Sequence, residues 1–381
     1  MQTRLNFSRL ALLLALVVGG LMAGCGKTDV ATTRGIYHWK NTFNPSPWEK
    51  QFLKKHHIEK LYLKLFEVDA NNDGRSADYP VVPVATTRFE QTVPEGMTIV
   101  PCVYITTAAL KACSNIPMLA YHIARRISDM ANCNGFEYHE VQLDCDWTTS
   151  TRQTYFDLCA EIDKILDKDS ISLESTVRMY QLSQPELMDI PADRLTLMAY
   201  NLGGLQHYDT RNSILDYDDA VPFLKKVSRL PDNMDFAFPT FGWGVEFRTW
   251  IDDSVLRTNA VLRHSDLNKD WCDFSRLIRS TDFEKDTLLE QYDDTGLSRY
   301  YEAMQEHVIE NSPVYNNHES GYTCLSIIRE EHGEVGEILK TKKAINSRHH
   351  ANTPYTTILY HLDSANLSYY SYHEIEKIYN R

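Results

Sequence analysis

The order of apolar and polar positions along the chain predicts strands and helices in turn. Short, nearly continuous apolar segments such as Leu61–Phe66 are typical of strands that are buried on both faces. Other segments place apolar residues at helical spacing. The predicted strands begin at Gly35, Leu61, Thr98, Tyr138, Ile171, Leu195, Met234 and Tyr355, and the predicted helices span Pro47–His57, Met118–Met130, Thr151–Leu166, Asp218–Val227 and Tyr372–Tyr379.

Strands that alternate with helices in this way pair in parallel, and eight such units predict an α/β fold, a (β/α)8 TIM-like barrel. An open doubly wound sheet is the alternative, but it normally carries a glycine-rich turn after its first strand, and His38–Asn41 contains no glycine. The stretch after Arg248 is too long for a loop. We therefore expect a barrel domain over 35–381 with a helical and partly β insertion, about 249–354, between strands seven and eight.

The N-terminus has the parts of an export signal. Arg4 and Arg9 precede the apolar run Leu10–Gly20, which is too short to span a membrane comfortably. The following Ala23-Gly24-Cys25 resembles a lipobox, the site of bacterial lipoprotein processing, although Met22 departs from the commonest pattern. We expect a signal peptide over 1–24, a lipid on Cys25, a tether over 25–34 and a location in the cell envelope, periplasmic or surface-exposed. An ordinary signal peptide with a coincidental cysteine is the alternative.

Charge and cysteine content narrow the partners. The net charge is −13, and removal of the signal with its two arginines makes it −13 − 2 = −15. Such acidity argues against nucleic acid as a partner, which calls for a basic surface. Because no CxxC pair is present, the sequence predicts no thiolate zinc site, and it predicts no cofactor. Cys113 and Cys133 flank one predicted helix and are candidates for a disulfide.

In a (β/α)8 barrel, function gathers at the carboxyl ends of the strands. The residues at these predicted ends are mostly carboxylates and aromatics, which suit acid–base work and stacking on sugar rings. They are Tyr37, His38, Trp39, Glu67, Asp69, Asp144, Asp146, Trp147, Glu174, Arg178, Tyr200, Asn201, Trp243, Glu246 and Asp363.

The strand that carries Asp144 and Asp146 is the most informative element. Alternation sends both side chains to one face, which in a barrel strand is the interior. Two nearby like charges raise each other's proton affinity, so that one carboxyl can stay protonated. Helix capping or binding of backbone amides is the alternative explanation.

Three segments resemble strands of family 18 glycoside hydrolases, the chitinase-like barrels. Leu143–Trp147 resembles the DxDxDWE strand, Leu197–Asn201 the Met-x-Tyr-Asp strand, and Phe236–Gly242 the Gly-x-Pro-x-Tyr-Gly strand, in the order of the family. The middle third of the chain is more similar still to an uncharacterised bacterial barrel family, domain of unknown function 3142. That resemblance covers the Gln-x-Asp-x-Asp strand, the turn at Thr149 and the helix that contains Tyr155.

The resemblance implies roles and also marks departures. Asp144, Asp146 and Tyr200 match catalytic positions, with Asp146 at the residue that orients the substrate acetamido group in the family's substrate-assisted mechanism. The family's proton donor, a Glu, is replaced by Thr148. The first Asp of the motif is replaced by Gln142, and an acid near Tyr200 by Asn201.

The predicted substrate-binding residues are Trp39, Trp147, Asn201, Trp243, Glu174 and Glu246, and the two glutamates are also candidates for a relocated acid. Core packing is the alternative role for the tryptophans, and a solvated loop position for Glu246.

These features leave three hypotheses. The first is a divergent glycoside hydrolase that acts on a glycan through Asp144 and Asp146. The second is a non-catalytic glycan-binding barrel that has lost the acid. The third is a metal-dependent hydrolase that uses the two aspartates with His38, although no second histidine has suitable spacing.

Overall fold

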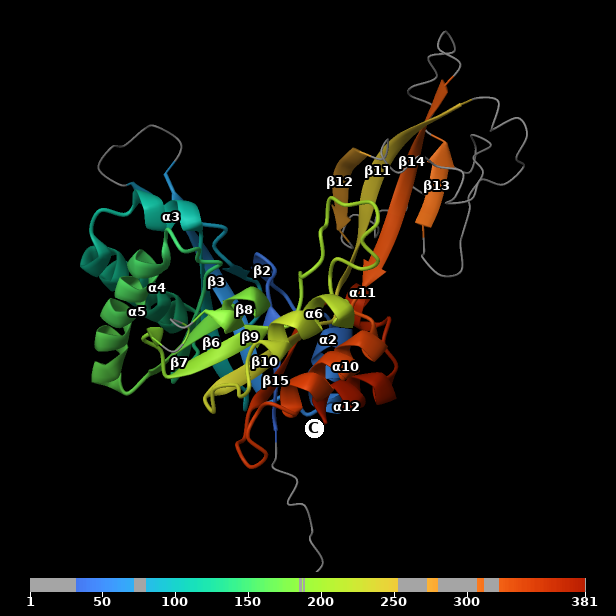
Figure 1. The fold of residues 1–381 in the computed structure, drawn as a ribbon. Helices are drawn as coiled ribbons and strands as arrows, with labels where there is room; N and C mark the ends of the chain where they lie inside the picture. The colour runs from blue at the N-terminus through green and yellow to red at the C-terminus, as the bar shows by residue number, and fades with distance from the viewer. Residues whose placement is uncertain are drawn as a thin grey trace, which may run out of the picture. The chain divides into compact units, whose positions relative to one another are not determined.

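Eight parallel strands close into a barrel (Figure 1). The computed structural model describes residues 32–71, 80–184, 187, 189–252, 273–279, 307–311 and 322–380. The first strand pairs with the last on one side and with the second on the other, which closes the sheet. The predicted (β/α)8 barrel is therefore confirmed. Its strands are β1 (Thr33–His38), β3 (Lys60–Ala70), β6 (Thr98–Ile105), β7 (Glu140–Asp144), β8 (Ser172–Arg178), β9 (Arg194–Met198), β10 (Met234–Pro239) and β15 (Thr356–Tyr360).

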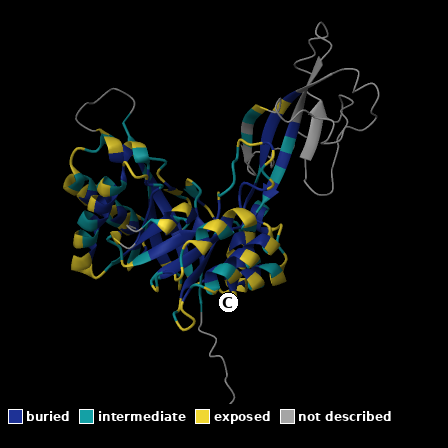
Figure 2. Cartoon of the chain, in the orientation of Figure 1, coloured by how far each residue is buried: buried dark blue, intermediate teal, exposed yellow. Residues whose placement is uncertain are grey.

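Helices follow most strands at or near the predicted positions. The first of them, α2, begins at Pro47 because Ser46 and Glu49 form reciprocal cap hydrogen bonds and proline suits the first helical position. The barrel strands are buried, whereas the helices expose their outer faces (Figure 2). The helices are α2 (Pro47–Lys55), α3 (Thr107–Ala112), α4 (Ile116–Asn134), α5 (Arg152–Leu166), α6 (Tyr217–Lys225), α10 (Val335–Asn346), α11 (Ser364–Leu367) and α12 (Tyr372–Tyr379), with short 3-10 helices at Asp167–Asp169 and Met179–Ser183.

A second, antiparallel sheet lies between β10 and β15 in the sequence. It contains β11 (Gly242–Asp252), β12 (Asp273–Arg279), β13 (His307–Asn311) and β14 (Tyr322–His332) in the order β12-β11-β14-β13. The expected insertion between the seventh and eighth strands therefore includes a sheet, and it begins about seven residues earlier than the sequence indicated, since β11 starts at Gly242. The long apolar alternation after Pro239 belongs to the insertion rather than to the barrel.

Arg329 of β14 fastens this sheet to the loop that follows β9. Its side chain is 1% exposed and donates hydrogen bonds to the carbonyl oxygens of Leu205, His207 and Tyr208. A buried guanidinium needs several such acceptors to offset its lost hydration. The base of the insertion is thus held to the carboxyl side of the barrel.

Two further expectations concern the N-terminal segment and the cysteines. The signal peptide and Cys25 lie outside the described residues, and β1 begins at Thr33, inside the expected tether. Cys113 and Cys133 are both free, so the disulfide prediction is wrong. The physical reason is distance: the helix between them is about 28 Å long, whereas bridged cysteines need Cα atoms within about 7 Å.

No helix covers the connection from β3 to β6 in the part of the chain that the structure describes. The described residues there form β4 (Val81–Val84), which pairs antiparallel with β3, and β5 (Arg88–Phe89), which pairs with β2 (Thr42–Phe43). Within the described ranges, we find no helix with the length and apolar content that a membrane span requires.

Candidate functional site

Gln142 and Asp144 of β7, and Asp146 just beyond the end of that strand, point into the barrel. The Tyr37 hydroxyl of β1 donates to Gln142 Oε1 at 2.7 Å, across the barrel. Thr176 of β8 contacts Asp144, and Arg178 of the same strand contacts Asp146. Strand alternation explains this pairing, because residues two apart on β7 meet residues two apart on β8. The predicted interior position of the two aspartates is therefore what the structure has.

Asp144 is nearly sealed from solvent, with 4% exposure. Its Oδ1 accepts a hydrogen bond from Thr176 Oγ1 at 2.7 Å. Burial raises the pKa of Asp144 to about 6, with a further rise from the Asp146 and Glu67 charges, while Arg178 and the Thr176 hydrogen bond lower it. Asp144 consequently holds its proton to a pH near neutrality.

Asp146 forms a bidentate ion pair with Arg178. Arg178 Nη2 lies 2.9 Å from Asp146 Oδ2, and Arg178 Nε donates to Asp146 Oδ1. The Asp146 side chain keeps 39% exposure, so the pair sits where the barrel opens to solvent. The guanidinium lies 5.9 Å from the centroid of the Tyr200 ring. A fork-to-fork pair of this kind fixes the orientation of both side chains.

An aromatic cluster stands beside the ion pair, with the ring of Tyr360 at its centre. The centroid of Tyr360 lies 5.9 Å from that of Trp39, 5.3 Å from that of Tyr200 and 5.5 Å from that of Phe241. Tyr200 and Phe241 are buried, whereas Trp39 and Tyr360 are half-buried. The cluster therefore combines two buried rings with two half-buried rings. Its members come from four different strands or strand ends.

Tyr200 has a hydroxyl without a partner among the described residues, and that hydroxyl is buried. Burial raises the pKa of Tyr200 far above its usual value, and the nearby Tyr360 adds to the rise. The phenol is therefore a neutral donor. Asn201, the next residue, is exposed and adopts a left-handed backbone conformation with φ of 56°. Tyr200 lies in the candidate site and Asn201 at its rim.

Trp147 and Thr148 occupy the last two positions of the family motif, but their side chains have structural roles in this protein. Trp147 is fully buried, and its ring packs edge-on against Phe156 at 5.5 Å. Thr148 lies in the turn that starts α5, where its backbone N–H donates to Thr151 Oγ1 at 3.0 Å. The ring of Trp147 is therefore a core element in this structure, and the side chain of Thr148 belongs to a helix-start turn.

Glu174 lies deeper in the barrel than the two aspartates. It is near the start of β8, fully buried, with Oε2 accepting from Gln142 Nε2 at 3.2 Å and Oε1 lying 4.0 Å from Lys60 Nζ. Burial, and then the hydrogen bond with Glu140, raise the pKa of Glu174 well above its usual range. Its position below the strand ends removes it from the solvent-facing rim where the sequence placed it.

Glu246 and Trp243 belong to the insertion. Glu246 is buried within β11, opposite Ile328 of β14. Trp243, three residues before Glu246 on the same strand, is half-buried, and its ring centroid lies 5.2 Å from that of Phe241. Trp243 Nε1 donates to Glu331 Oε2 at 2.7 Å, so a buried carboxylate orients this indole beside the aromatic cluster.

Sequence inspection missed two side chains next to the aspartates. Tyr104, on β6, is in register with Asp144, and its pKa is raised first by burial and then by the Asp146 and Asp144 charges. Tyr360 ends the eighth strand. Both tyrosines occupied the carboxyl ends of predicted strands, so alternation counted back from those ends would have found them.

The metal hypothesis finds no support in the geometry. His38 lies on the other face of β1 from Tyr37, packs against Phe43 at 4.9 Å, and has a pKa lowered to about 3, mainly by burial. Among the residues that the structure describes, no three His, Cys, Asp or Glu side chains are placed to hold a metal ion.

Comparisons with known proteins find similarity in structure alone. No family model matches the sequence, and no curated protein matches it. The Group IV chitinase of Ostrinia furnacalis, solved with allosamidin, has a TM-score of 0.50 at 10% identity over 91% of this chain and 98% of that chain. The GH18 chitinase of Cycas revoluta, solved with (GlcNAc)3, has a TM-score of 0.45 at 12% identity over 92% and 99% of the two chains. A chitinase of Chromobacterium violaceum has a TM-score of 0.48 at 12% identity over 92% and 100%.

At these identities the comparison with the Ostrinia furnacalis enzyme establishes the fold and nothing about chemistry. This chain and that enzyme share the (β/α)8 barrel fold. What this chain does must be argued from its own residues.

The raised pKa of Asp144 predicts a pH dependence of stability. Because the folded-state pKa, about 6, exceeds the ordinary value of 3.8, the stability that protonated Asp144 provides is present below about pH 4 and is lost as the pH rises through 6. The loss for this one group amounts to about 3 kcal/mol at most. Asp144→Asn keeps the shape and does not titrate. Urea unfolding from about pH 4 to about pH 7 should show the wild type losing stability relative to Asp144→Asn. Parallel pH profiles for the two proteins would contradict this assignment.

Proposed function

We propose that the protein binds a glycan at the carboxyl ends of the barrel strands, as a glycoside hydrolase-like barrel whose primary role is recognition. The observation that carries this proposal is the aromatic cluster with its half-buried rings Trp39, Trp243 and Tyr360, which is joined to the Asp146–Arg178 ion pair through the Tyr200 ring. Sugar rings present apolar C–H faces and polar edges. Aromatic faces with fixed charged groups beside them match both.

The same geometry argues for binding over hydrolysis. A hydrolase of this kind needs a carboxyl group that protonates the leaving oxygen. The motif position for it is Thr148, in the turn before α5. Asp146 is paired with Arg178, and Glu67 is paired with Lys64 Nζ at 2.6 Å. Of the carboxyl groups around Asp144, these two are therefore already engaged with cations.

Removal of the Trp39 ring tests glycan binding. We expect Trp39→Ala to weaken binding about tenfold, since one stacked ring is lost while the ion pair remains. The measurement is calorimetric titration of the wild type and the variant with the N-acetylglucosamine trimer and a panel of bacterial, fungal and plant glycans.

Trp48→Ala is the matched control. Trp48 is 40% exposed on α2, where it stacks on Phe52 and has no contact with the aromatic cluster. We expect its affinity to equal that of the wild type. If no glycan in the panel binds the wild type, or if both variants lose affinity equally, glycan recognition at this site is refuted.

A second candidate, a divergent hydrolase, is favoured by one observation. Burial raises the pKa of Asp144 to about 6, into the range in which an enzyme carboxyl can act as a general acid. In this hypothesis Asp144 replaces the missing acid at Thr148.

Two substitutions distinguish the candidates. For a binding protein we expect no glycan cleavage by the wild type and measurable cleavage by Thr148→Glu, which supplies an acid worth typically about 10²- to 10⁴-fold in rate. For a hydrolase we expect cleavage by the wild type that Asp144→Asn abolishes. Product analysis on the panel used for binding, with Trp48→Ala as control, decides which outcome holds.

We also propose that a lipid on Cys25 anchors the protein in the cell envelope, on the support of the Ala23-Gly24-Cys25 sequence that follows an apolar run. We expect Cys25→Ser to abolish lipid attachment and to move the protein from the membrane fraction to the soluble fraction. Mass spectrometry of the N-terminal peptide and cell fractionation are the measurements. Unchanged fractionation of the variant would exclude this anchor.

A further inference from the structure

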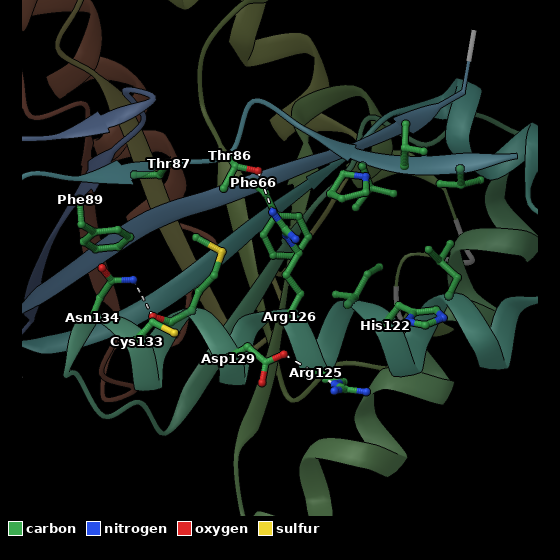
Figure 3. Close-up of a pocket in the computed structure, with 17 residues that line it drawn as sticks. Phe66, Thr86, Thr87, Phe89, His122, Arg125, Arg126, Asp129, Cys133 and Asn134 are labelled. Atoms are coloured by element: carbon green, nitrogen blue, oxygen red, sulfur yellow. Dashed lines mark hydrogen bonds and ion pairs between the residues drawn. The ribbon is translucent and has the colours of Figure 1, made fainter. Parts of the chain in front are cut away.

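A cavity lies between α4 and the strands β3 and β4, outside the barrel (Figure 3). Its volume is about 680 Å³, within the range of about 300–1,000 Å³ that is usual for small-molecule sites. An α-helix lies in the connections that follow β1, β6, β7, β9 and β10, whereas the described residues after β8 form only a short 3-10 helix. In the connection from β3 to β6 the described residues supply only β4 and β5, so the face of β3 is covered incompletely by them and by α4.

The walls of the cavity are mostly apolar and come from three elements. The apolar residues include Phe66 and Val68 of β3, Val82 of β4, and Leu119, Ile123 and Met130 of α4. The lining on α4 extends from Leu119 to Asn134, and 15 residues of helix span about 22 Å. The cavity is therefore a trough that follows the helix, which suits an extended chain better than a compact ring system.

Of the two arginines that line this trough, Arg126 has no carboxylate partner among the described residues. The Arg126 guanidinium stands over the Phe66 ring, with Cζ 5.1 Å from the ring centroid, and Nη2 donates to Thr86 Oγ1 at 2.9 Å. Figure 3 shows this side chain between α4 and the β3–β4 ribbon. Arg126 Nε is buried and has no hydrogen-bond partner. No carboxylate among the described residues forms an ion pair with Arg126.

The described residues do not supply an acceptor for every N–H donor of Arg126. A guanidinium has five N–H donors, and an arginine that is partly withdrawn from water is normally paired with an anion or with several acceptors. Arg125, its neighbour on α4, does have a carboxylate, Asp129, at 3.6 Å, but that pair is exposed to solvent. The cavity thus offers mostly apolar walls, the Arg125–Asp129 pair, and in Arg126 a guanidinium whose buried Nε–H has no acceptor.

We propose that this trough binds a medium-chain carboxylate, with the carboxylate on the Arg126 guanidinium and the alkyl chain along the apolar walls. Charge complementarity selects an anionic head, and the elongated apolar walls select an unbranched chain. The head group completes the hydrogen bonds of Arg126 as a charge-assisted pair. The chain removes apolar surface of β3 and α4 from water. The site is separate from the proposed glycan site and does not depend on it.

Titration with decanoate and with decanamide, its uncharged analogue, tests the proposal. The full chain with Cys25→Ser serves as the common background, so that no attached lipid interferes. We expect saturable binding of decanoate, and binding of decanamide weaker by about tenfold or more, because the charged hydrogen bonds are lost. Arg126→Met should weaken decanoate to the level of decanamide and leave decanamide unchanged. Arg126→Lys should restore part of the difference.

Controls separate binding in the trough from general effects. Arg229→Met removes an exposed arginine that is paired with Asp232 elsewhere on the surface, and it should bind decanoate as the parent does. Leu119→Trp and Met130→Trp each fill one end of the trough, and at least one should abolish binding. Circular dichroism and thermal unfolding establish that each variant is folded, and at one decanoate concentration the melting temperature should rise more for the parent than for Arg126→Met.

Several results would overturn the proposal. One is equal affinity of the parent for decanoate and decanamide, which would leave Arg126 without a role. Another is an affinity for decanoate equal to that of the parent in Arg126→Met, or in both Leu119→Trp and Met130→Trp. A third is a concentration-dependent dimer, seen by analytical ultracentrifugation, that Leu119→Trp disrupts and decanoate does not, because the trough would then be an interface between two copies.

Discussion

The closure of the parallel sheet between β1 and β15 is the constraint on which the rest of the structure depends. Once eight strands form a closed ring, alternate side chains of every strand must share one interior. Residues that are far apart in sequence then become neighbours at fixed spacing. Asp144 meets Thr176, and Asp146 meets Arg178, because β7 and β8 are adjacent and in parallel register. The candidate site is a consequence of that register.

The closed interior also decides which carboxylates can carry chemistry. A buried charge must be paired or must take up a proton. Near the amino ends of the strands, Asp235 is fully buried and is paired with Arg194 at 2.6 Å, which leaves it structural. Near the carboxyl ends, Arg178 pairs with Asp146, whereas burial raises the pKa of Asp144. The distribution of only a few cations inside the barrel thus separates carboxyls that look equivalent in the sequence.

Two departures from the regular barrel pattern lie beside the proposed glycan site and the proposed carboxylate site. The insertion after β10 brings Trp243 beside the aromatic cluster, with its indole fixed by the buried Glu331. The connection after β3 lacks a helix among its described residues and leaves the trough beside α4, with Arg126 in it. Each departure exposes apolar or aromatic groups that a complete ring of helices would cover.

Sequence alone determined the barrel, because hydrophobic periodicity and strand–helix alternation are local properties: all eight strands begin within a few residues of their predicted starts. It also determined that Asp144 and Asp146 share a face, since alternation needs only one strand. Tertiary structure alone decided the environment of each group. The depth of Glu174, the burial of Trp147 and the pairing of Asp146 with Arg178 all depend on neighbours from distant segments. Burial and charge pairing are properties of the closed ring of strands, and a linear pattern does not contain them.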